Sequence, residues 1–287
     1  MGQKEGITQK TQIDNIKKIF TTTVYSTYVP LTILSFCLEH SIVGDTAFVY
    51  HFNNLLTHLA VTMLVFAFAR GLGLSLLAAF FGSLLFGIHP MHVESVAWIS
   101  GRKDVLYAVF YLLALLAYQR YIKEGLVKSY VWSVLFGFLS ILAKPMALSL
   151  PLILFLCDWF NGRRANFRLF LEKAPFFLAV IPIAWITYTL NARVPGQNIF
   201  EASLIWIWTL MFYLKKFFVP APLVPLYQLP EPVSFYNLSY VSSLVLFLVL
   251  VLGLIKFRQK RWFMFAFFYY FISIFFLLRY DNLVDRS

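Results

Sequence analysis

The sequence has few charged residues, and this scarcity excludes an ordinary soluble domain. Charged side chains make up 13% of its 287 residues, whereas hydrophobic side chains make up 60%. A typical globular protein has about 25% charged residues. A soluble chain of this length cannot bury so much apolar surface, because its interior volume is too small. The 32 Phe, 16 Tyr and 7 Trp suit a lipid-facing surface with aromatic side chains at the membrane boundary. We therefore predict a polytopic α-helical membrane protein.

The small number of cysteines and the lack of a barrel pattern narrow the class of membrane protein further. The only cysteines are Cys37 and Cys157, and the predicted topology places them on opposite sides of the membrane, so we expect no disulfide. The alternating ten-residue pattern of outer-membrane barrels is also missing. Acidic residues number 13 against 24 basic ones, which gives a net charge of +11. In a membrane protein this excess marks helix ends, so we expect no nucleic-acid partner.

Eight apolar stretches are predicted to cross the membrane, since a spanning helix needs about 20 mostly apolar residues. They are residues 49–69, 72–90, 104–119, 128–144, 145–160, 174–192, 238–255 and 262–278. The predicted fold class is therefore an all-α membrane helix bundle with about eight spanning helices plus interfacial helices. Residues 49–287 would form this multi-pass module.

Two segments are predicted to lie at the membrane surface instead. Residues 1–48 form an outward-facing arm, in which apolar residues from Ile13 to Phe20 recur at helical spacing. A second apolar stretch in this arm, residues 31–43, is too short to span. Residues 200–236 contain five prolines. Backbone of this kind cannot lie in lipid with its polar groups unsatisfied, so we expect an interfacial or re-entrant element.

Basic residues orient the bundle, because cytoplasmic loops carry an excess of Lys and Arg. Those in the short loops of one side are Arg70, Arg120, Lys123, Lys128, Arg163, Arg164, Arg168, Lys173, Lys256, Arg258, Lys260 and Arg261. This side is predicted to be cytoplasmic, and residues 88–104 then face outward. The assignment requires residues 193–237 to return without crossing.

Residues 88–104 hold the main cluster of ionisable groups, and at membrane depth such groups suggest function. Arg102 lies beside a predicted helix start and would form an anion site or a solvated charged loop. Asp104 suits a helix cap. His89, His92 and Glu94 do not share one helix face, so we favour a hydrogen-bonded motif that shapes the loop over a metal site.

Two further polar features are predicted at the outer face. His51, Asn54 and His58 lie at positions i, i+3 and i+7 of one helix face. They form either a polar stripe that hydrogen-bonds neighbouring helices or a contact for substrate or lipid phosphate. Lys144, before Pro145, is an outward cation that either extends to the membrane surface or binds phosphate.

The order of these motifs resembles a known family. Tyr28-Val-Pro-Leu31 precedes His51-Phe-Asn-Asn-Leu-Leu-Thr-His58, then come His89-Pro-Met-His-Val-Glu-Ser95, Gly101-Arg-Lys-Asp104 and Leu142-Ala-Lys-Pro-Met146. Together they resemble the membrane half of the tetratricopeptide-repeat-linked glycosyltransferases. That family is similar to the transmembrane O-mannosyltransferases and implies a GT-C-like helix bundle.

The resemblance implies a function. The donor would be a polyprenyl-phosphate sugar, a membrane lipid bound at the outer interface, and the acceptor would be a protein or glycan. The implied catalytic residues are Glu94 and Asp104, with Asp104 orienting Arg102. The implied substrate and lipid-phosphate ligands are Arg102, Lys144, His89, His92, His51 and His58. No cofactor is expected, and the sequence does not support a metal.

The chain departs from the family pattern at both ends. The family has a first spanning helix followed by an acidic pair that includes the base, and Asp14 does not match that pair. Val284-Asp-Arg286 resembles the start of a motif that continues further. We therefore expect an incomplete fragment. The expected location of this multi-pass chain is a bacterial inner membrane, with its active face toward the periplasm. The alternatives are a non-catalytic scaffold or pseudoenzyme, and a lipid or small-molecule transporter.

Overall fold

The chain is helical in its computed structural model, which describes residues 16–24, 27–190, 198–224 and 227–275. Within these ranges the only β-type pairing is an isolated bridge between Val24 and Thr27. The α-helices are α2 (Pro30–Val43), α3 (Ala47–Gly71), α4 (Leu76–Ile88), α5 (Val93–Ala97), α6 (Arg102–Glu124), α7 (Val127–Ala143), α8 (Leu150–Phe160), α9 (Phe167–Leu190), α10 (Ile199–Phe218), α11 (Leu238–Phe257) and α12 (Arg261–Ile274). Three short 3-10 helices are η1 (Pro90–His92), η2 (Ile99–Gly101) and η3 (Pro145–Ser149). The predicted all-α membrane class is confirmed.

Each of the eight predicted spans contains a helix, but fewer of these helices are long enough to cross a membrane alone. In the described part of the chain, four qualify by length and composition: α3, α6 with its preceding η2 turn, α9 and α11. A fifth would be the pair Leu76–Ile88 and Pro90–Ala97, which is bent by 49°. Helix α4 has 13 residues and ends just before Pro90, so by itself it reaches only about 20 Å of a core about 30 Å thick.

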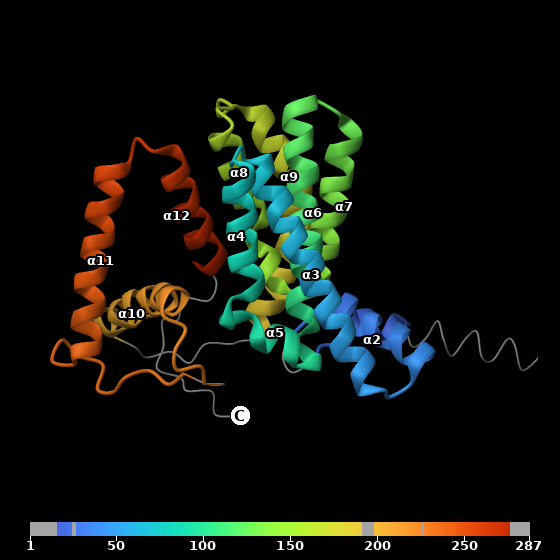
Figure 1. Cartoon of the computed structure of the whole chain (residues 1–287), viewed down its shortest axis with the longest axis horizontal. Coiled ribbons are helices and arrows are strands. Elements are labelled where there is room, and N and C mark those ends of the chain that lie inside the picture. Colours follow the sequence, from blue (N-terminus) through green and yellow to red (C-terminus); the bar gives the residue numbers. More distant parts are fainter. Residues whose placement is uncertain (1–15, 25–26, 191–197, 225–226, 276–287) are drawn as a thin grey trace, which may run out of the picture. The chain divides into compact units, whose positions relative to one another are not determined.

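The chain folds as two compact units, Met1–Leu154 with Ala165–Ala192 and Phe155–Arg164 with Arg193–Ser287. In the first unit, α3, α4, α6, α7 and α9 run side by side (Figure 1). Helices α6 and α7 are joined by hydrogen bonds from the Ser133 hydroxyl to Ala114 O, 2.8 Å, and from the Ser140 hydroxyl to Tyr107 O, 3.0 Å. Such bonds hold helices together where lipid supplies no hydrophobic driving force.

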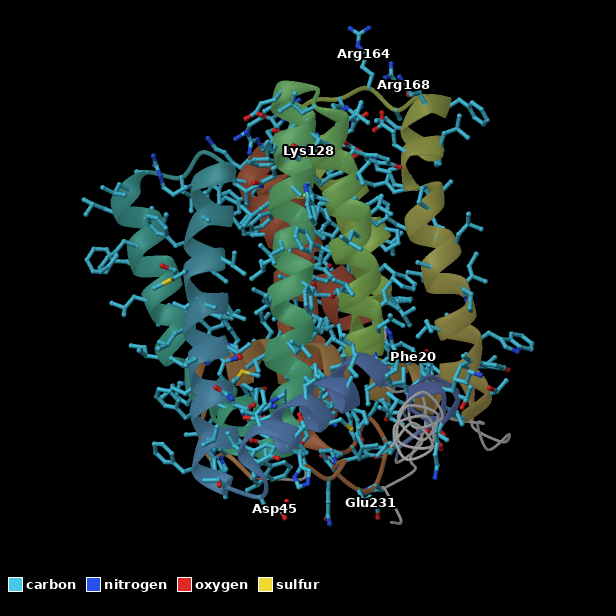
Figure 2. All side chains as sticks on the ribbon, turned by 90° about the vertical axis from the view of Figure 1, so that its right-hand side faces the viewer. Phe20, Asp45, Lys128, Arg164, Arg168 and Glu231 are labelled. Carbon is cyan, nitrogen blue, oxygen red and sulfur yellow. The ribbon has the colours of Figure 1, made fainter. Side chains whose placement is uncertain are left out.

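Basic residues gather at one end of the first unit. Lys123 Nζ donates to Gly71 O at 2.6 Å and so joins the end of α6 to the end of α3. Figure 2 shows Lys128 and Arg168 at this end and Phe20 and Asp45 at the opposite end. The predicted grouping of basic loops on one side is therefore present within this unit.

A buried cluster at this basic end fastens α9 to α6 and α7. The Glu172 carboxylate accepts from the hydroxyl of Tyr121 at 3.0 Å, and Glu172 O accepts from the hydroxyl of Tyr130 at 3.0 Å. Lys173 is fully buried and its ammonium donates to the hydroxyl of Tyr118. This cluster satisfies two charged residues that apolar helices could not otherwise bury.

Helix α2 corresponds to the short apolar stretch predicted in the arm. It packs at the end of the first unit that lies opposite the basic residues. The Thr32 hydroxyl donates to Ala143 O, 2.9 Å, and so fixes α2 to the end of α7. The Tyr28 hydroxyl donates to Phe20 O, 3.0 Å, and ties down the helical segment of residues 16–21. Burial raises the pKa of Tyr28, so the hydroxyl keeps its proton for this bond. Residues 13–15 of the predicted amphipathic helix lie outside the described residues.

The second unit contains α10, α11 and α12. Helix α10 runs crosswise to α11 and α12 (Figure 1) and packs Leu204 and Ile205 against Tyr240 of α11. The Tyr270 hydroxyl of α12 donates to Leu210 O, 3.0 Å. Helix α10 is not among the described helices that qualify to cross a membrane by length and composition, and its interfacial or re-entrant placement stays a prediction. After α10, Lys216 Nζ donates to Pro222 O at 2.6 Å and so folds the proline-rich segment back onto the helix.

Candidate functional site

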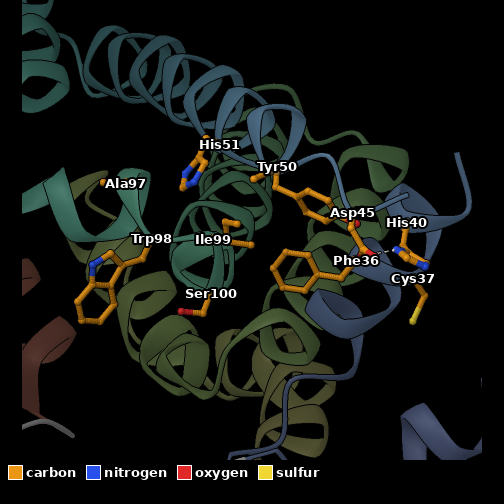
Figure 3. A pocket seen from close by; sticks show the side chains of 11 residues that line it. Phe36, Cys37, His40, Asp45, Tyr50, His51, Ala97, Trp98, Ile99 and Ser100 are labelled. Carbon is orange, nitrogen blue, oxygen red and sulfur yellow. Dashed lines mark ion pairs between the residues drawn. The ribbon is translucent and has the colours of Figure 1, made fainter. Parts of the chain in front are cut away.

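An open, mostly apolar pocket lies at the end of the first unit opposite the basic loops. Its volume is about 890 Å³. Its walls come from α2, the start of α3, and the α5–η2 segment (Figure 3). The lining residues are Phe36, Cys37, His40, Asp45, Ala47, Tyr50, His51, Ala97, Trp98, Ile99 and Ser100. The predicted outward loop and the predicted arm therefore meet around one cavity.

Arg102 is buried behind the pocket wall. Its guanidinium lies 4.4 Å from the ring centre of Phe36 and 5.6 Å from that of Tyr50, and both rings line the pocket. Nη1 is paired with the Glu39 carboxylate, and the two side chains are 8% and 7% exposed. Nε donates to Asn54 Oδ1 at 3.0 Å and Nη2 donates to Tyr50 O at 3.2 Å. All three guanidinium nitrogens are therefore engaged within the protein.

The prediction that Asp104 orients Arg102 is wrong. Glu39 of α2 pairs with Arg102, and the Asp104 carboxylate instead accepts from Lys144 Nζ at the end of α7. The reason is helical geometry, because residues two apart on α6 point to different sides of the helix. The Lys144 and Asp104 side chains are 24% and 25% exposed, so this second ion pair stays accessible.

The three polar residues predicted to share one face of α3, His51, Asn54 and His58, differ in their surroundings. Asn54 is buried and its Nδ2 donates to Trp98 O at 2.9 Å, while His58 Nε2 lies 2.9 Å from Gly87 O. These two residues hydrogen-bond neighbouring segments, as one of the two predicted alternatives requires. His51 is exposed and lines the pocket.

The predicted residues of the outward loop gather around His58 or face solvent. The His58 and His92 rings lie 5.3 Å apart between centres, and those of His89 and His92 lie 6.2 Å apart. His89 Nδ1 accepts from Met91 N at 3.3 Å, a bond that shapes the loop as predicted. Glu94 on α5 is exposed. Among the described residues, no group of three or more His, Cys, Asp or Glu is arranged to hold a metal ion.

Gly101 sets how closely η2 approaches α5. A Cβ at this position would lie 2.8 Å from Glu94 O and 2.8 Å from Ser95 O. Contacts this short to backbone atoms are not tolerated, so only glycine allows the chain to turn here and start α6 with Arg102 in the buried network.

Sequence reasoning missed three residues of this region: Glu39, His40 and Asp45. A signal for Glu39 was available, because a single carboxylate in the apolar stretch of residues 31–43 needs a buried partner. His40 and Asp45 line the pocket and pair with each other, with 3.2 Å between His40 Nδ1 and Asp45 Oδ1. Their meeting depends on the turn at Gly44, which hydrophobic patterning does not reveal.

Fold and site together define a multi-pass helical membrane protein with a mostly apolar pocket, lined by a few titratable side chains, at one end of its first unit. The chain is similar to proteins named protein O-mannosyl-transferase, which confirms the resemblance predicted from its motifs. It is 35% identical over 134 residues to Tmtc1 of Drosophila melanogaster, covering 47% of this chain and 16% of that protein. It is 33% identical over 189 residues to tmtc2 of Xenopus laevis, covering 59% of this chain and 22% of that protein.

A human relative shows the same partial coverage. The chain is 31% identical over 153 residues to protein O-mannosyl-transferase TMTC4 of Homo sapiens, covering 46% of this chain and 21% of that protein. The chain thus spans about a fifth of the length of these relatives. No family model and no solved structure matches it.

Proposed function

We propose that this chain is part of a membrane glycosyltransferase module that transfers a hexosyl group from a polyprenyl-phosphate donor to a protein or glycan acceptor. The similarity to proteins named protein O-mannosyl-transferase carries the proposal. The pocket between α2, α3 and α5–η2 is the proposed place of transfer. Its apolar walls suit an isoprenoid lipid, and its titratable side chains suit a reacting hydroxyl.

Fixed positive charge is what such a reaction requires, because the leaving group is a phosphate anion. Lys144 is the better phosphate ligand of the two predicted cations, since its ammonium remains partly exposed beside Asp104. The Arg102 guanidinium acts behind the pocket wall, where it holds α2, α3 and α6 together.

Of the predicted histidines, His51 lines the pocket and is the proposed substrate contact, whereas His58 is buried beside Gly87 O. Glu94, His89 and His92 are not among the residues that line the pocket, and their roles at the substrate stay predictions.

The pocket end is the proposed outward, periplasmic or luminal face, and a bacterial inner membrane is the proposed location. The grouping of Arg70, Lys123, Lys128 and Arg168 at the opposite end supports this orientation by the positive-inside rule. Residues 1–48, which include α2, are proposed to form an outward-facing arm. The tetratricopeptide repeats that the family resemblance implies belong to the same proposal.

A non-catalytic scaffold is the second candidate, and one observation favours it. Both predicted phosphate ligands, Arg102 and Lys144, are already paired with a carboxylate of the chain. In a scaffold these pairs would serve stability alone.

Reconstitution of the purified chain into liposomes tests the proposal. The liposomes contain radiolabelled polyprenyl-phosphate mannose, and a peptide rich in Ser and Thr is supplied on the pocket side. Incorporation of label into the peptide is expected, and the Lys128→Ala variant should match the unaltered chain. A chain that binds the donor without transfer would favour the scaffold, and movement of donor between leaflets without transfer would favour a transporter.

A further inference from the structure

Two exposed cations converge on the turn between α3 and α4, at the basic end of the first unit. Arg70 Nη1 donates to Leu74 O at 2.6 Å, and Lys123 Nζ donates to Gly71 O at 2.6 Å. Both cationic side chains belong to exposed residues. A guanidinium has five N–H donors and an ammonium has three, so each cation keeps donors for a ligand.

In the described part of the chain, no carboxylate neutralises either cation. Neither Arg70 nor Lys123 forms an ion pair there, whereas the neighbouring Arg120 of α6 is paired with Glu124. The first turn of α4, which follows these carbonyl groups in the chain, contains no acidic residue. The positive end of its helix dipole therefore adds to the charge of the two side chains. The α3–α4 turn is thus suited to attract an anion.

A buried amide without a partner lies beside the same turn. Gln119 of α6 is 4% exposed, and its Nε2 is the one buried side-chain nitrogen or oxygen in the described ranges that lacks a hydrogen-bond partner. Its carboxamide lies against Gly71, where a Cβ would collide with Oε1 and lie 3.5 Å from Nε2. A buried donor is unfavourable until it is paired, so this amide calls for an acceptor oxygen that the chain does not supply.

Apolar side chains next to the cations indicate which kind of anion fits. Helix α3 is long and apolar enough to cross a membrane and ends at Gly71, and Leu74, Leu76 and Leu77, which follow it, are all exposed. At the membrane boundary, basic side chains reach the headgroups while apolar ones contact the acyl chains. A soluble anion would gain nothing from these leucines, whereas a lipid contacts both kinds of side chain.

We propose that the α3–α4 turn binds the headgroup of an anionic glycerophospholipid. Arg70 and Lys123 hold the phosphate by charge-assisted hydrogen bonds. Gln119 Nε2 donates to an oxygen of the same headgroup once the Lys123 ammonium has turned from Gly71 O toward the phosphate. Anionic membrane surfaces attract basic segments of this kind. The inference stands apart from the proposed function, because this turn lies at the end of the first unit opposite the pocket.

Thermal unfolding of the purified chain in detergent, with lipid added in mixed micelles, tests the proposal. Phosphatidylglycerol should raise Tm more than phosphatidylcholine, because a ligand that binds only the folded state stabilises it. Lys123→Met and Arg70→Met should each raise the apparent Kd for phosphatidylglycerol by about 10- to 100-fold, the effect of losing one charge-assisted hydrogen bond. Methionine keeps an apolar stem of similar length, so these variants remove the charge with little loss of packing.

Two further variants separate a defined site from general attraction between charges. Lys128→Met is the matched control, because Lys128 is an exposed cation at the same end of the first unit (Figure 2) but is not part of the turn. It should bind phosphatidylglycerol as tightly as the unaltered chain. Gln119→Leu removes the unpartnered donor, so it should weaken lipid binding while leaving the lipid-free Tm unchanged or higher.

Four results would contradict this site. Equal weakening by Lys128→Met and Lys123→Met would leave only diffuse attraction between basic loops and lipid. Equal rises of Tm with phosphatidylglycerol and phosphatidylcholine would exclude a preference for anionic lipid. Competition by glycerol phosphate, which carries the phosphate without acyl chains, would show a site for a soluble anion instead of a lipid. A lower lipid-free Tm in Gln119→Leu would make Gln119 a structural residue and remove it from the site.

Discussion

Arg102 of α6 and Glu39 of α2 form an ion pair whose side chains are 8% and 7% exposed. The pair spans 63 positions in the sequence and is completed by Asn54 and Tyr50 O of α3. It therefore locks three helices together at the pocket end of the first unit. Burying two charges is unfavourable unless their hydrogen bonds are satisfied, and here all three guanidinium nitrogens have a partner.

Removal of either charge should destabilise the protein strongly. Glu39→Ala and Arg102→Ala each leave the opposite charge buried without its partner, which costs about 3–5 kcal/mol. Thermal unfolding in detergent should show a large fall in Tm for both single variants. The double variant should be less destabilised than the sum of the two, since it leaves no unpaired charge.

An exposed pair in the same unit supplies the comparison. The Arg120 and Glu124 side chains are 64% and 45% exposed, so Glu124→Ala should change the free energy of unfolding by less than about 1 kcal/mol. Equal effects of Glu39→Ala and Glu124→Ala would contradict the buried network.

Gly101→Ala should disturb the start of α6. The new Cβ would meet backbone oxygens of Glu94 and Ser95 at 2.8 Å, and backbone cannot move aside as a flexible side chain can. Overpacking of this kind costs about 1–3 kcal/mol. The matched control is Gly82→Ala on α4, where a Cβ meets nothing within 4 Å. Alanine there should be neutral or stabilising by up to about 1 kcal/mol, and equal Tm values for the two variants would refute this packing.

The helices were predictable because long apolar segments are visible in the sequence and must form helices in lipid. Breaks were harder to predict, since α4 ends at Ile88 and the chain bends at Pro90 inside one continuous apolar run. Among the described residues, the number of helices able to span is therefore lower than the number of predicted apolar segments. Hydropathy measures composition, whereas spanning depends on unbroken helix length.

The pairings within the predicted site were not predictable from the sequence. Of residues 88–104, only the segment 97–100 lines the pocket together with His51, whereas His89, His92 and Glu94 are not among its lining residues. The partner of Arg102 was assigned to its sequence neighbour Asp104, although the true partner is Glu39, far away in the chain. Ion pairing is decided by tertiary packing, and a single sequence carries no direct record of it.

When polyprenyl phosphate binds, we expect the Lys144 ammonium to leave the Asp104 carboxylate and pair with the phosphate group. Lys144→Ala is expected to weaken binding by about 10- to 100-fold, since a charge-assisted hydrogen bond contributes about 1.5–3 kcal/mol. Asp104→Asn should strengthen binding, because it frees the ammonium from its carboxylate. Equilibrium binding of radiolabelled polyprenyl phosphate in nanodiscs measures both. Unchanged binding in Lys144→Ala, with Lys128→Ala as control, would remove Lys144 from the site.

Cysteine labelling should report which face of the membrane holds the pocket. Cys37 is exposed and lines the cavity, whereas Cys157 is buried. A membrane-impermeant maleimide should therefore modify Cys37 in intact cells and leave Cys157 unmodified. A cysteine placed at Lys128, at the basic end of the first unit, should react only after the cells are permeabilised, because positively charged loops stay in the cytoplasm. The reverse pattern, with Lys128→Cys labelled from outside and Cys37 protected, would invert the topology. The pocket would then open to the cytoplasm, and an outward-facing donor could not reach it.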